Sequence, residues 1–339
     1  MKKNIVICLD GTWNRPDRPE DDVSCETNVK NLFDICVNDK STQVTYYDQG
    51  VGSHWYNKIR GGISGRGLSK NIREAYFEVS RVYNPGDKVF IFGFSRGAYT
   101  ARSLAGFIYS CGLIKKSSLN EKSIEKAFTI YREGDHQERK EFKDNNIPCP
   151  VEMIGVWDTV GALGIPIGFL KIFSDRFLQF HDTKINREIK AAYHALAIDE
   201  QRQIFQPTLW DITKPHDNQV VEQVWFSGVH SDIGGGYEER HLSDIAFKWM
   251  IDKAVKNHGL KIIDGHGYIF QPDHTKKIHD SYKFYFGPKE RRVATVSEYY
   301  YPKVHISVLK KVQERRNYKP LALVDYKKRA TLEPYIIVE

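Results

Sequence analysis

The chain has 339 residues, enough for one large α/β domain or two smaller domains, and its 41% hydrophobic and 27% charged side chains are typical of a soluble globular protein. Its formal charge of +7 comes without a dense Lys/Arg block or a known nucleic-acid motif, so nucleic acid is not expected as a partner. No apolar run approaches the length of a membrane span.

The N-terminal stretch "MKKNIVICLDGTWN" predicts a buried strand, residues 4–9, that ends in a polar turn. Its apolar core, "IVICL", is too short for a signal peptide. We therefore expect a protein that is cytoplasmic as synthesised, and secretion would need a route without such a signal. The cysteines show no metal-binding or C-x-x-C spacing, and Cys8 inside this strand is expected to be a buried reduced thiol.

Strands and helices alternate along the rest of the chain. The predicted strands lie at residues 43–53 (with a glycine loop), 88–92, 151–157 and 222–230, and the predicted helices at residues 62–83, 96–112, 121–135, 186–198 and 242–255. This alternation predicts an α/β fold with a mainly parallel sheet, helices on both faces and inserted loops and helices. We expect a single domain over residues 1–339, with a core at about 4–258 and residues 259–339 packed on it or completing it.

The stretch "GFSRGAYTAR" places Ser95 between two glycines, at the point where the strand of residues 88–92 gives way to a helix. Gly-x-Ser-x-Gly in this context is typical of the nucleophile elbow of α/β hydrolases. The serine there has strained backbone geometry, and the glycines remove Cβ atoms that would collide with neighbouring chain. The pattern therefore predicts a serine nucleophile.

Two further strand ends carry the residue types that a serine nucleophile needs. Asp158 follows "VEMIGVW" and His230 ends "EQVWFSGVH", which gives the order Ser, Asp, His that α/β hydrolases use. An imidazole takes the serine proton, and a carboxylate orients the imidazole. A helix N-cap role for Asp158 and an ordinary loop position for His230 are the structural alternatives. Among the other histidines, His305 in "YPKVHISV" is the strongest rival as the base.

A hydrolase also needs N–H donors for the developing oxyanion. We expect one at the backbone of Arg96, directly after the nucleophile, and others at Gly11 or Thr12 in "DGTWN". Asp10 is expected to brace this loop. The alternative, Asp10 as a magnesium ligand of a phosphatase, leaves the elbow unexplained, so no metal is predicted. The glycine-rich stretch "GRGLSKNI" is weak evidence for a phosphate site and is interpreted as packing beside the elbow.

Five stretches together, "DGTWN", "GVGS", "GFSRGAYTAR", "VWDTVGALG" and "WFSGVHSDIGGGY", resemble the DUF2235 family over roughly residues 4–250. That family includes the catalytic domain of the Tle1-class lipase effectors of type VI secretion. The resemblance implies an α/β-hydrolase fold and a Ser–Asp–His triad at Ser95, Asp158 and His230. It also implies a phospholipase-like activity that cleaves acyl esters. The mechanism expected of such a triad requires no metal or organic cofactor.

The leading functional prediction is therefore a serine esterase or lipase, with phospholipid as the favoured substrate. A small-ester hydrolase, a peptidase, an acyltransferase and a non-catalytic membrane- or partner-binding module are the alternatives. The expected partners are a lipid or small acyl ester, a membrane surface in transient contact, and an immunity or regulatory protein. The apolar stretch "TVGALGIPIGFLKIFSDRFLQF", residues 159–180, is either a flap beside Ser95 or a buried connecting helix.

Overall fold

A single parallel sheet organises the protein. We describe it from a computed structural model, in which the described residues are 2–11, 25–50, 64–160, 185–202, 205–211, 216–281, 291, 302–323, 332 and 335–339. Eight strands lie in the order β2-β1-β3-β4-β5-β6-β7-β8, and every neighbouring pair is parallel. The strands are β1 (Asn4–Leu9), β2 (Gln43–Asp48), β3 (Lys88–Phe94), β4 (Val151–Trp157), β5 (Ile189–Ala197), β6 (Val220–Phe226), β7 (Lys303–His305) and β8 (Ile336–Val338).

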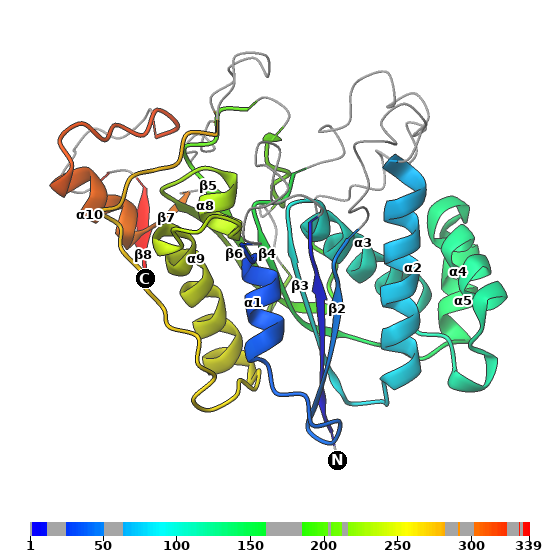
Figure 1. Ribbon diagram of the computed structural model, residues 1–339. Coiled ribbons are helices and arrows are strands. Elements are labelled where there is room, and N and C mark those ends of the chain that lie inside the picture. Colours follow the sequence, from blue (N-terminus) through cyan, green and yellow to red (C-terminus); the bar gives the residue numbers. More distant parts are fainter. Residues whose placement is uncertain are drawn as a thin grey trace.

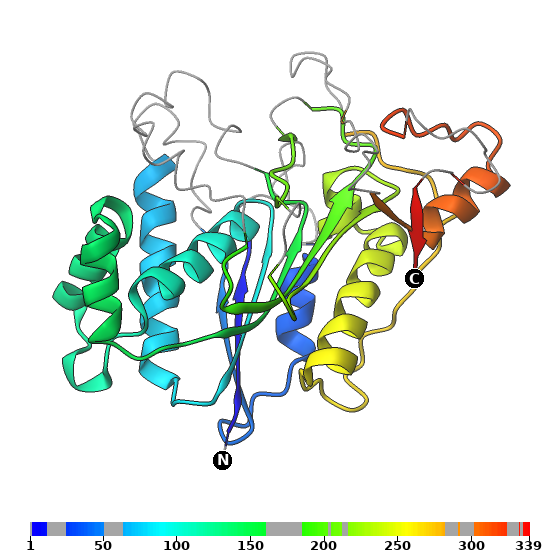
Figure 2. The ribbon, with the colours of Figure 1, turned by 180° about the vertical axis from the view of Figure 1, so that it is seen from behind.

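Helices cover both faces of this sheet (Figure 1), and Figure 2 shows the same arrangement from behind. They are α1 (Asn28–Ile35), α2 (Ser64–Val82), α3 (Arg96–Cys111), α4 (Glu121–Glu133), α5 (His136–Asp144), α8 (His230–Gly234), α9 (His241–Asp252) and α10 (Ile306–Glu314). The prediction of an α/β-hydrolase-like fold, with a mainly parallel sheet and helices on both faces, is confirmed.

The two faces are separate cores because side chains alternate along each strand. In β1, Ile5, Ile7 and Leu9 pack in a cluster with α2, α3 and α4, whereas Val6 and Cys8 pack on the other side with α1 and α9. Both sets are buried, so the strand reads as a continuous apolar run rather than an alternating one. Burial raises the pKa of the Cys8 thiol well above its ordinary value, in keeping with the expected inert buried thiol.

The helix predicted at residues 186–198 is wrong, because the chain there forms β5 between β4 and β6. This strand is buried on both faces, and its small apolar residues have no period-2 signal. Alanine favours helices in isolation, but the pairing of this run with β4 and β6 is a tertiary effect that helix propensity does not include.

The strand predicted at residues 222–230 is too long at its end. β6 stops at Phe226, and His230 is the first residue of α8. Further along, β7 and β8 extend the sheet beyond β6, and α10 packs on them with its own small apolar cluster. The segment after Gly259, for which the sequence predicts no element, therefore contributes strands to the same sheet.

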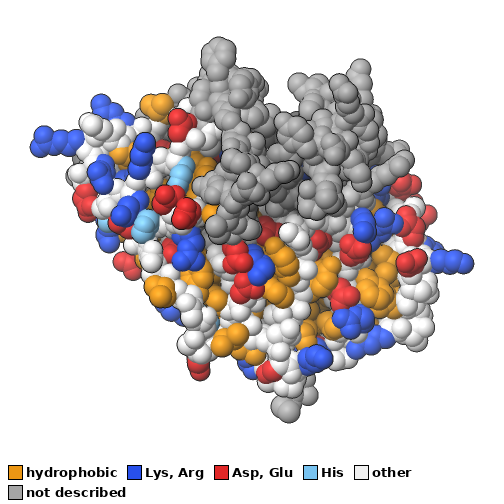
Figure 3. Space-filling model, in the orientation of Figure 1, with side chains coloured by type: hydrophobic (Ala, Val, Ile, Leu, Met, Phe, Trp, Pro, Cys, Tyr) orange, Lys and Arg blue, Asp and Glu red, His pale blue; other side chains and the backbone are white. Residues whose placement is uncertain are grey.

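Within the described ranges, no helix is long and apolar enough to cross a bilayer. On the face seen in Figure 3, the described Lys/Arg and Asp/Glu side chains are interspersed, and no large area of one sign forms.

Candidate active site

The turn between β3 and α3 forms a strained elbow with Ser95 at its tip. Ser95 has φ 57° and ψ −118°, a conformation that costs a residue with a side chain roughly 1–3 kcal/mol. Its amide donates to the carbonyl of Trp157 at 3.1 Å, which anchors the elbow to β4. Both flanking glycines are required by contact: a Cβ on Gly93 would lie 2.4 Å from the Gly97 carbonyl oxygen, and one on Gly97 would lie 2.1 Å from that of Leu9.

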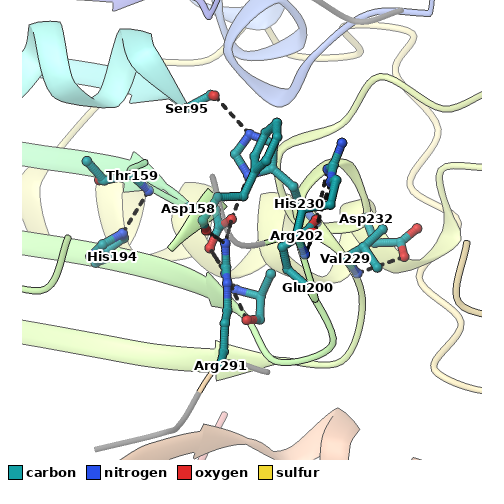
Figure 4. Close-up of polar contacts among 12 residues, drawn as sticks. Ser95, Asp158, Thr159, His194, Glu200, Arg202, Val229, His230, Asp232 and Arg291 are labelled. Carbon is teal, nitrogen blue, oxygen red and sulfur yellow. Dashed lines mark hydrogen bonds and ion pairs between the residues drawn. The ribbon is translucent and has the colours of Figure 1, made fainter. Parts of the chain in front are cut away.

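His230 lies between the other two predicted catalytic residues (Figure 4). Its Nε2 lies 2.8 Å from Ser95 Oγ, and its Nδ1 lies 2.6 Å from Asp158 Oδ2. The ring is buried and packs against the Phe94 ring at 4.6 Å and the Phe205 ring at 4.7 Å. The structure therefore brings Ser95, His230 and Asp158 together in one hydrogen-bonded chain.

Asp158 is fully buried directly after β4, with φ 37°. Its amide donates to the Ala195 carbonyl at 2.7 Å, and its Oδ1 accepts the Ala197 amide at 3.0 Å, so β5 holds its backbone and its side chain. The guanidinium of Arg291 donates two hydrogen bonds to the same carboxylate, from Nη1 to Oδ1 at 2.5 Å and from Nη2 to Oδ2 at 2.9 Å. Among the described residues, the partners of this carboxylate are therefore Ala197, Arg291 and His230.

Burial alone would raise the pKa of Asp158, but the charge of Arg291 and the hydrogen bond to His230 outweigh it and hold this pKa well below its ordinary value. The pKa of His230 is lowered, because burial disfavours the imidazolium more than the bond to Asp158 favours it. At neutral pH the geometry therefore presents an ionised carboxylate and a neutral imidazole, the states that a general base requires.

The loop after β1 lies against the elbow. A Cβ on Gly11 would lie 2.8 Å from the Phe94 carbonyl oxygen and 3.0 Å from Ser95 Cβ, so only glycine permits this approach. The Gly11 amide donates to Asp10 Oδ1 at 2.8 Å, so in this structure it is directed to Asp10. Thr12 lies outside the described residues. The Arg96 amide remains the predicted donor at the first position of α3.

Asp10 holds this loop through several contacts. Its Oδ2 accepts the hydroxyls of Thr27 at 2.6 Å and Tyr47 at 2.8 Å, while Oδ1 takes the Gly11 amide. Burial raises the pKa of Asp10 to about 6, partly offset by these hydrogen bonds. In the described part of the chain, no group of three or more His, Cys, Asp or Glu is arranged to hold a metal ion.

A second buried ion pair supports the backbone of His230. Glu200 and Arg202 form a two-pronged pair at 2.9 and 2.8 Å, and Glu200 Oε2 accepts the His230 amide at 3.1 Å. The guanidinium of Arg202 lies 3.8 Å from the Phe205 ring centroid, and that ring contacts the His230 ring. Glu200 and Arg202 therefore fix the start of α8.

The sequence patterns do not single out Arg291, Glu200 or Arg202. Glu200 and Arg202 follow β5, and treating that strand as a helix hid the fact that they lie at a strand end. Arg291 lies in a stretch, "KERRV", that has the composition of a solvated surface, and no local pattern separates it from its neighbours.

His305 occupies a different setting from His230. It is the N-cap of α10, and its Nδ1 lies 2.8 Å from Ser307 Oγ and accepts the Ser307 amide at 3.2 Å. Its ring stacks on Phe226 at 4.6 Å, and burial lowers its pKa to about 4. Most of the candidate flap of residues 159–180, namely residues 161–180, lies outside the described residues.

The family described as the catalytic domain of Tle1-like phospholipase effectors of the type VI secretion system matches residues 3–253. The chain belongs to this family. The resemblance found in the sequence is thereby confirmed, and the matched range includes Ser95, Asp158 and His230 but ends before Arg291.

One relative is the uncharacterized protein YEL023C of Saccharomyces cerevisiae, which is 29% identical to this chain over 261 residues. The aligned region covers 65% of this chain and 36% of that protein. The chain thus spans well under two thirds of that relative's length.

Three solved structures are similar at low identity. An uncharacterized protein from Pseudomonas aeruginosa has 19% identity and a TM-score of 0.44 over 77% of this chain and 46% of its own. The Tle1 effector bound to the VgrG spike has 19% identity and a TM-score of 0.41 over 70% and 51%. The esterase Est2 of Thermogutta terrifontis has 12% identity and a TM-score of 0.39 over 76% and 83%.

Proposed function

We propose that this protein is a serine hydrolase that cleaves carboxylic esters, with glycerophospholipid as its substrate class. The observation that carries the proposal is the continuous chain from Ser95 Oγ through the His230 ring to Asp158, at 2.8 and 2.6 Å. Membership of a phospholipase effector family supports the choice of lipid esters over other acyl compounds.

In the proposed reaction, Ser95 Oγ attacks the ester carbonyl while His230 Nε2 takes the hydroxyl proton. The carbonyl π electrons move to oxygen, and the Arg96 amide at the start of α3 donates to that oxyanion. When the intermediate collapses, the carbonyl re-forms, the ester C–O bond breaks, and the alcohol leaves with the proton from His230. The products of this half-reaction are the acyl-enzyme and the alcohol.

Deacylation repeats these steps with water. His230 takes a proton from water as the water oxygen bonds to the acyl carbon, and the Ser95 C–O bond then breaks with return of the proton to Oγ. A free fatty acid and the resting enzyme result. Asp158 remains ionised throughout and stabilises the imidazolium that forms twice in the cycle. Because the substrate is part of a lipid assembly, the protein makes transient contact with a membrane surface during the reaction. An immunity or regulatory protein as a partner stays a prediction from the sequence.

Lipid mass spectrometry after incubation with mixed phospholipid liposomes tests this proposal, with Ser95→Ala as the matched control. We expect the wild-type protein to release fatty acid and lysophospholipid, and Ser95→Ala to release neither. Release by Ser95→Ala that equals the wild type would refute the triad. Hydrolysis of a nitrophenyl ester without any attack on liposomes would retain the serine esterase and reject the phospholipid.

Fluorophosphonate labelling separates an enzyme from a binding module on the same fold. These reagents form a bond to an activated serine, so the wild-type protein should be labelled at Ser95 and the Ser95→Ala variant should not. A folded wild-type protein that resists the reagent would favour the non-catalytic alternative.

A further inference from the structure

Arg291 bonds Asp158 and two backbone carbonyls through both terminal nitrogens of its guanidinium, although it lies far along the chain from the motifs. Its side chain is fully buried, and its Nη1 and Nη2 each bond one oxygen of Asp158. Nη1 also donates to the Ala197 carbonyl at 2.9 Å, and Nη2 to the Phe205 carbonyl. Figure 4 shows Arg291 on the opposite side of the Asp158 carboxylate from His230.

This geometry does two things to Asp158. A guanidinium fork on both carboxylate oxygens fixes the plane of the carboxylate, and therefore the direction from Oδ2 to His230. In addition, Oδ2 is shared between Arg291 Nη2 and His230 Nδ1, so the negative charge that would stabilise the imidazolium is already partly compensated. A lysine in place of Arg291 would supply the charge without the fork.

We propose that Arg291 is a positioning residue of the triad, which holds Asp158 ionised and correctly oriented and thereby sets the lower pH limit of activity through His230. This inference rests on the proposed hydrolase function.

The charges around His230 support this role. Asp158 faces the ring and Glu200 faces its backbone amide, while Arg291 and Arg202 pair with these carboxylates one to one. The charges of these two carboxylates and two guanidinium groups therefore cancel when His230 is neutral. Protonation of His230 adds a positive charge that no further carboxylate in this set compensates.

His194, which also interacts with Asp158, adds no charge in the relevant range. It is fully buried, and burial together with the charge of Arg102 lowers its pKa to about 3. Removal of Arg291 would therefore leave an excess negative charge beside His230, and would raise the pH at which the coupled His230–Asp158 pair takes up a proton.

The test is the pH dependence of kcat/KM on a soluble nitrophenyl ester for Arg291→Met and Arg291→Lys. For Arg291→Met we expect the acidic limb to move to higher pH by about one unit, because protonation of the pair inactivates the base. Its plateau should fall about 10- to 100-fold, since the carboxylate is free to turn. Arg291→Lys should also lose plateau activity, with a smaller movement of the limb.

Arg102→Met is the matched control. Arg102 is another largely buried arginine that donates to a loop carbonyl, that of Thr208, and packs 4.9 Å from the Trp210 ring centroid, but it makes no contact with Asp158. This variant should lose stability without moving the acidic limb, because burial, the larger cause of the low pKa of His194, remains. Circular dichroism of each variant verifies folding. If Arg291→Met does not fold, Arg291→Lys decides the question.

The inference is overturned if the acidic limb of the pH profile of Arg291→Met lies at the wild-type pH, whatever the plateau value of kcat/KM. Arg291 would then only stabilise the local structure. An Arg291→Lys protein with the wild-type limb and plateau would also overturn the inference. Failure of the proposed function looks different, because Ser95→Ala would then retain wild-type activity on the same ester.

Discussion

Gly97, in the first turn of α3, lies directly against the carbonyl oxygen of Leu9 at the end of β1. A Cβ at this position would lie 2.1 Å from that oxygen and 2.6 Å from the carbonyl carbon of Asp10. The contact sets how closely the elbow helix approaches the loop that carries Gly11. Ser95 and that loop are therefore positioned by the same backbone contact, between segments far apart in the sequence.

Gly97→Ala should consequently cost both stability and activity. The obstructing atoms are backbone atoms at the end of β1, which is paired with a strand on each side, and they cannot move as a side chain would. We therefore expect a loss of about 1–3 kcal/mol in the free energy of unfolding. Activity should fall further, because α3 must shift and carry Ser95 with it. Denaturant unfolding and ester hydrolysis measure the two effects.

Gly106→Ala in the same helix is the control. Its added Cβ would meet the Tyr131 hydroxyl at 3.1 Å, the far end of a side chain, and alanine favours a helix interior by about 1 kcal/mol over glycine. Near wild-type stability and activity are expected there. Equal effects of the two substitutions would contradict the special role of the Gly97 contact.

His230→Ala and His305→Ala should separate the two candidate bases. Loss of the His230 ring removes the proposed proton acceptor of Ser95, so kcat should fall by orders of magnitude, about 10⁴-fold or more. His305 bonds Ser307 and stacks on Phe226, so its removal should lower stability and leave kcat nearly unchanged. Steady-state kinetics at constant pH decides; a reversed outcome would assign the base to His305.

Asp10 should make stability depend on pH in an unusual direction. Its pKa is raised from 3.8 to about 6 in the folded protein, so between these values the folded state binds more protons than the unfolded chain. Stability contributed by this group is therefore present at low pH and is lost as pH rises from about 4 to about 6. The full loss is about 3 kcal/mol.

Asp10→Asn removes this titration while it keeps the shape of the side chain. We expect the difference in unfolding free energy, wild type minus variant, to fall as pH rises through this window and to be level above it. Urea unfolding at closely spaced pH values measures that difference. A difference independent of pH would mean that Asp10 has an ordinary pKa.

The apolar stretch after Asp158 provides a prediction that the sequence alone supports. If residues 159–180 contain a membrane-contacting flap, Phe169→Ser with Phe173→Ser should lower activity on liposomes far more than on a soluble short-chain ester. The two assays are run on the same preparation. Equal losses of activity on the two substrates would mean that the segment only stabilises the fold. Unchanged activity on liposomes would mean that these two phenylalanines have no role in lipid contact.

Several features could be predicted from the sequence because their physical signals are local. An apolar run followed by Gly-x-Ser-x-Gly and a helical pattern fits few geometries, so the order β3, Ser95, α3 follows from a short stretch. Asp158 and His230 could be selected because parallel strands bring their carboxyl ends to one edge. The order Ser, Asp, His along the chain could therefore be predicted without knowledge of tertiary contacts.

Other features depend on what the chain meets after folding. The run that forms β5 is a strand because two strands flank it, and only those neighbours overcome its alanine-rich, helix-like composition. Arg291 lies 133 residues from Asp158, and its role arises from burial beside a carboxylate, which no periodicity encodes. Sequence patterns therefore predicted Ser95 at the elbow and determined the class of fold, whereas tertiary packing alone decided which charges surround Asp158 and His230, because electrostatic pairing depends on distance in space and not along the chain.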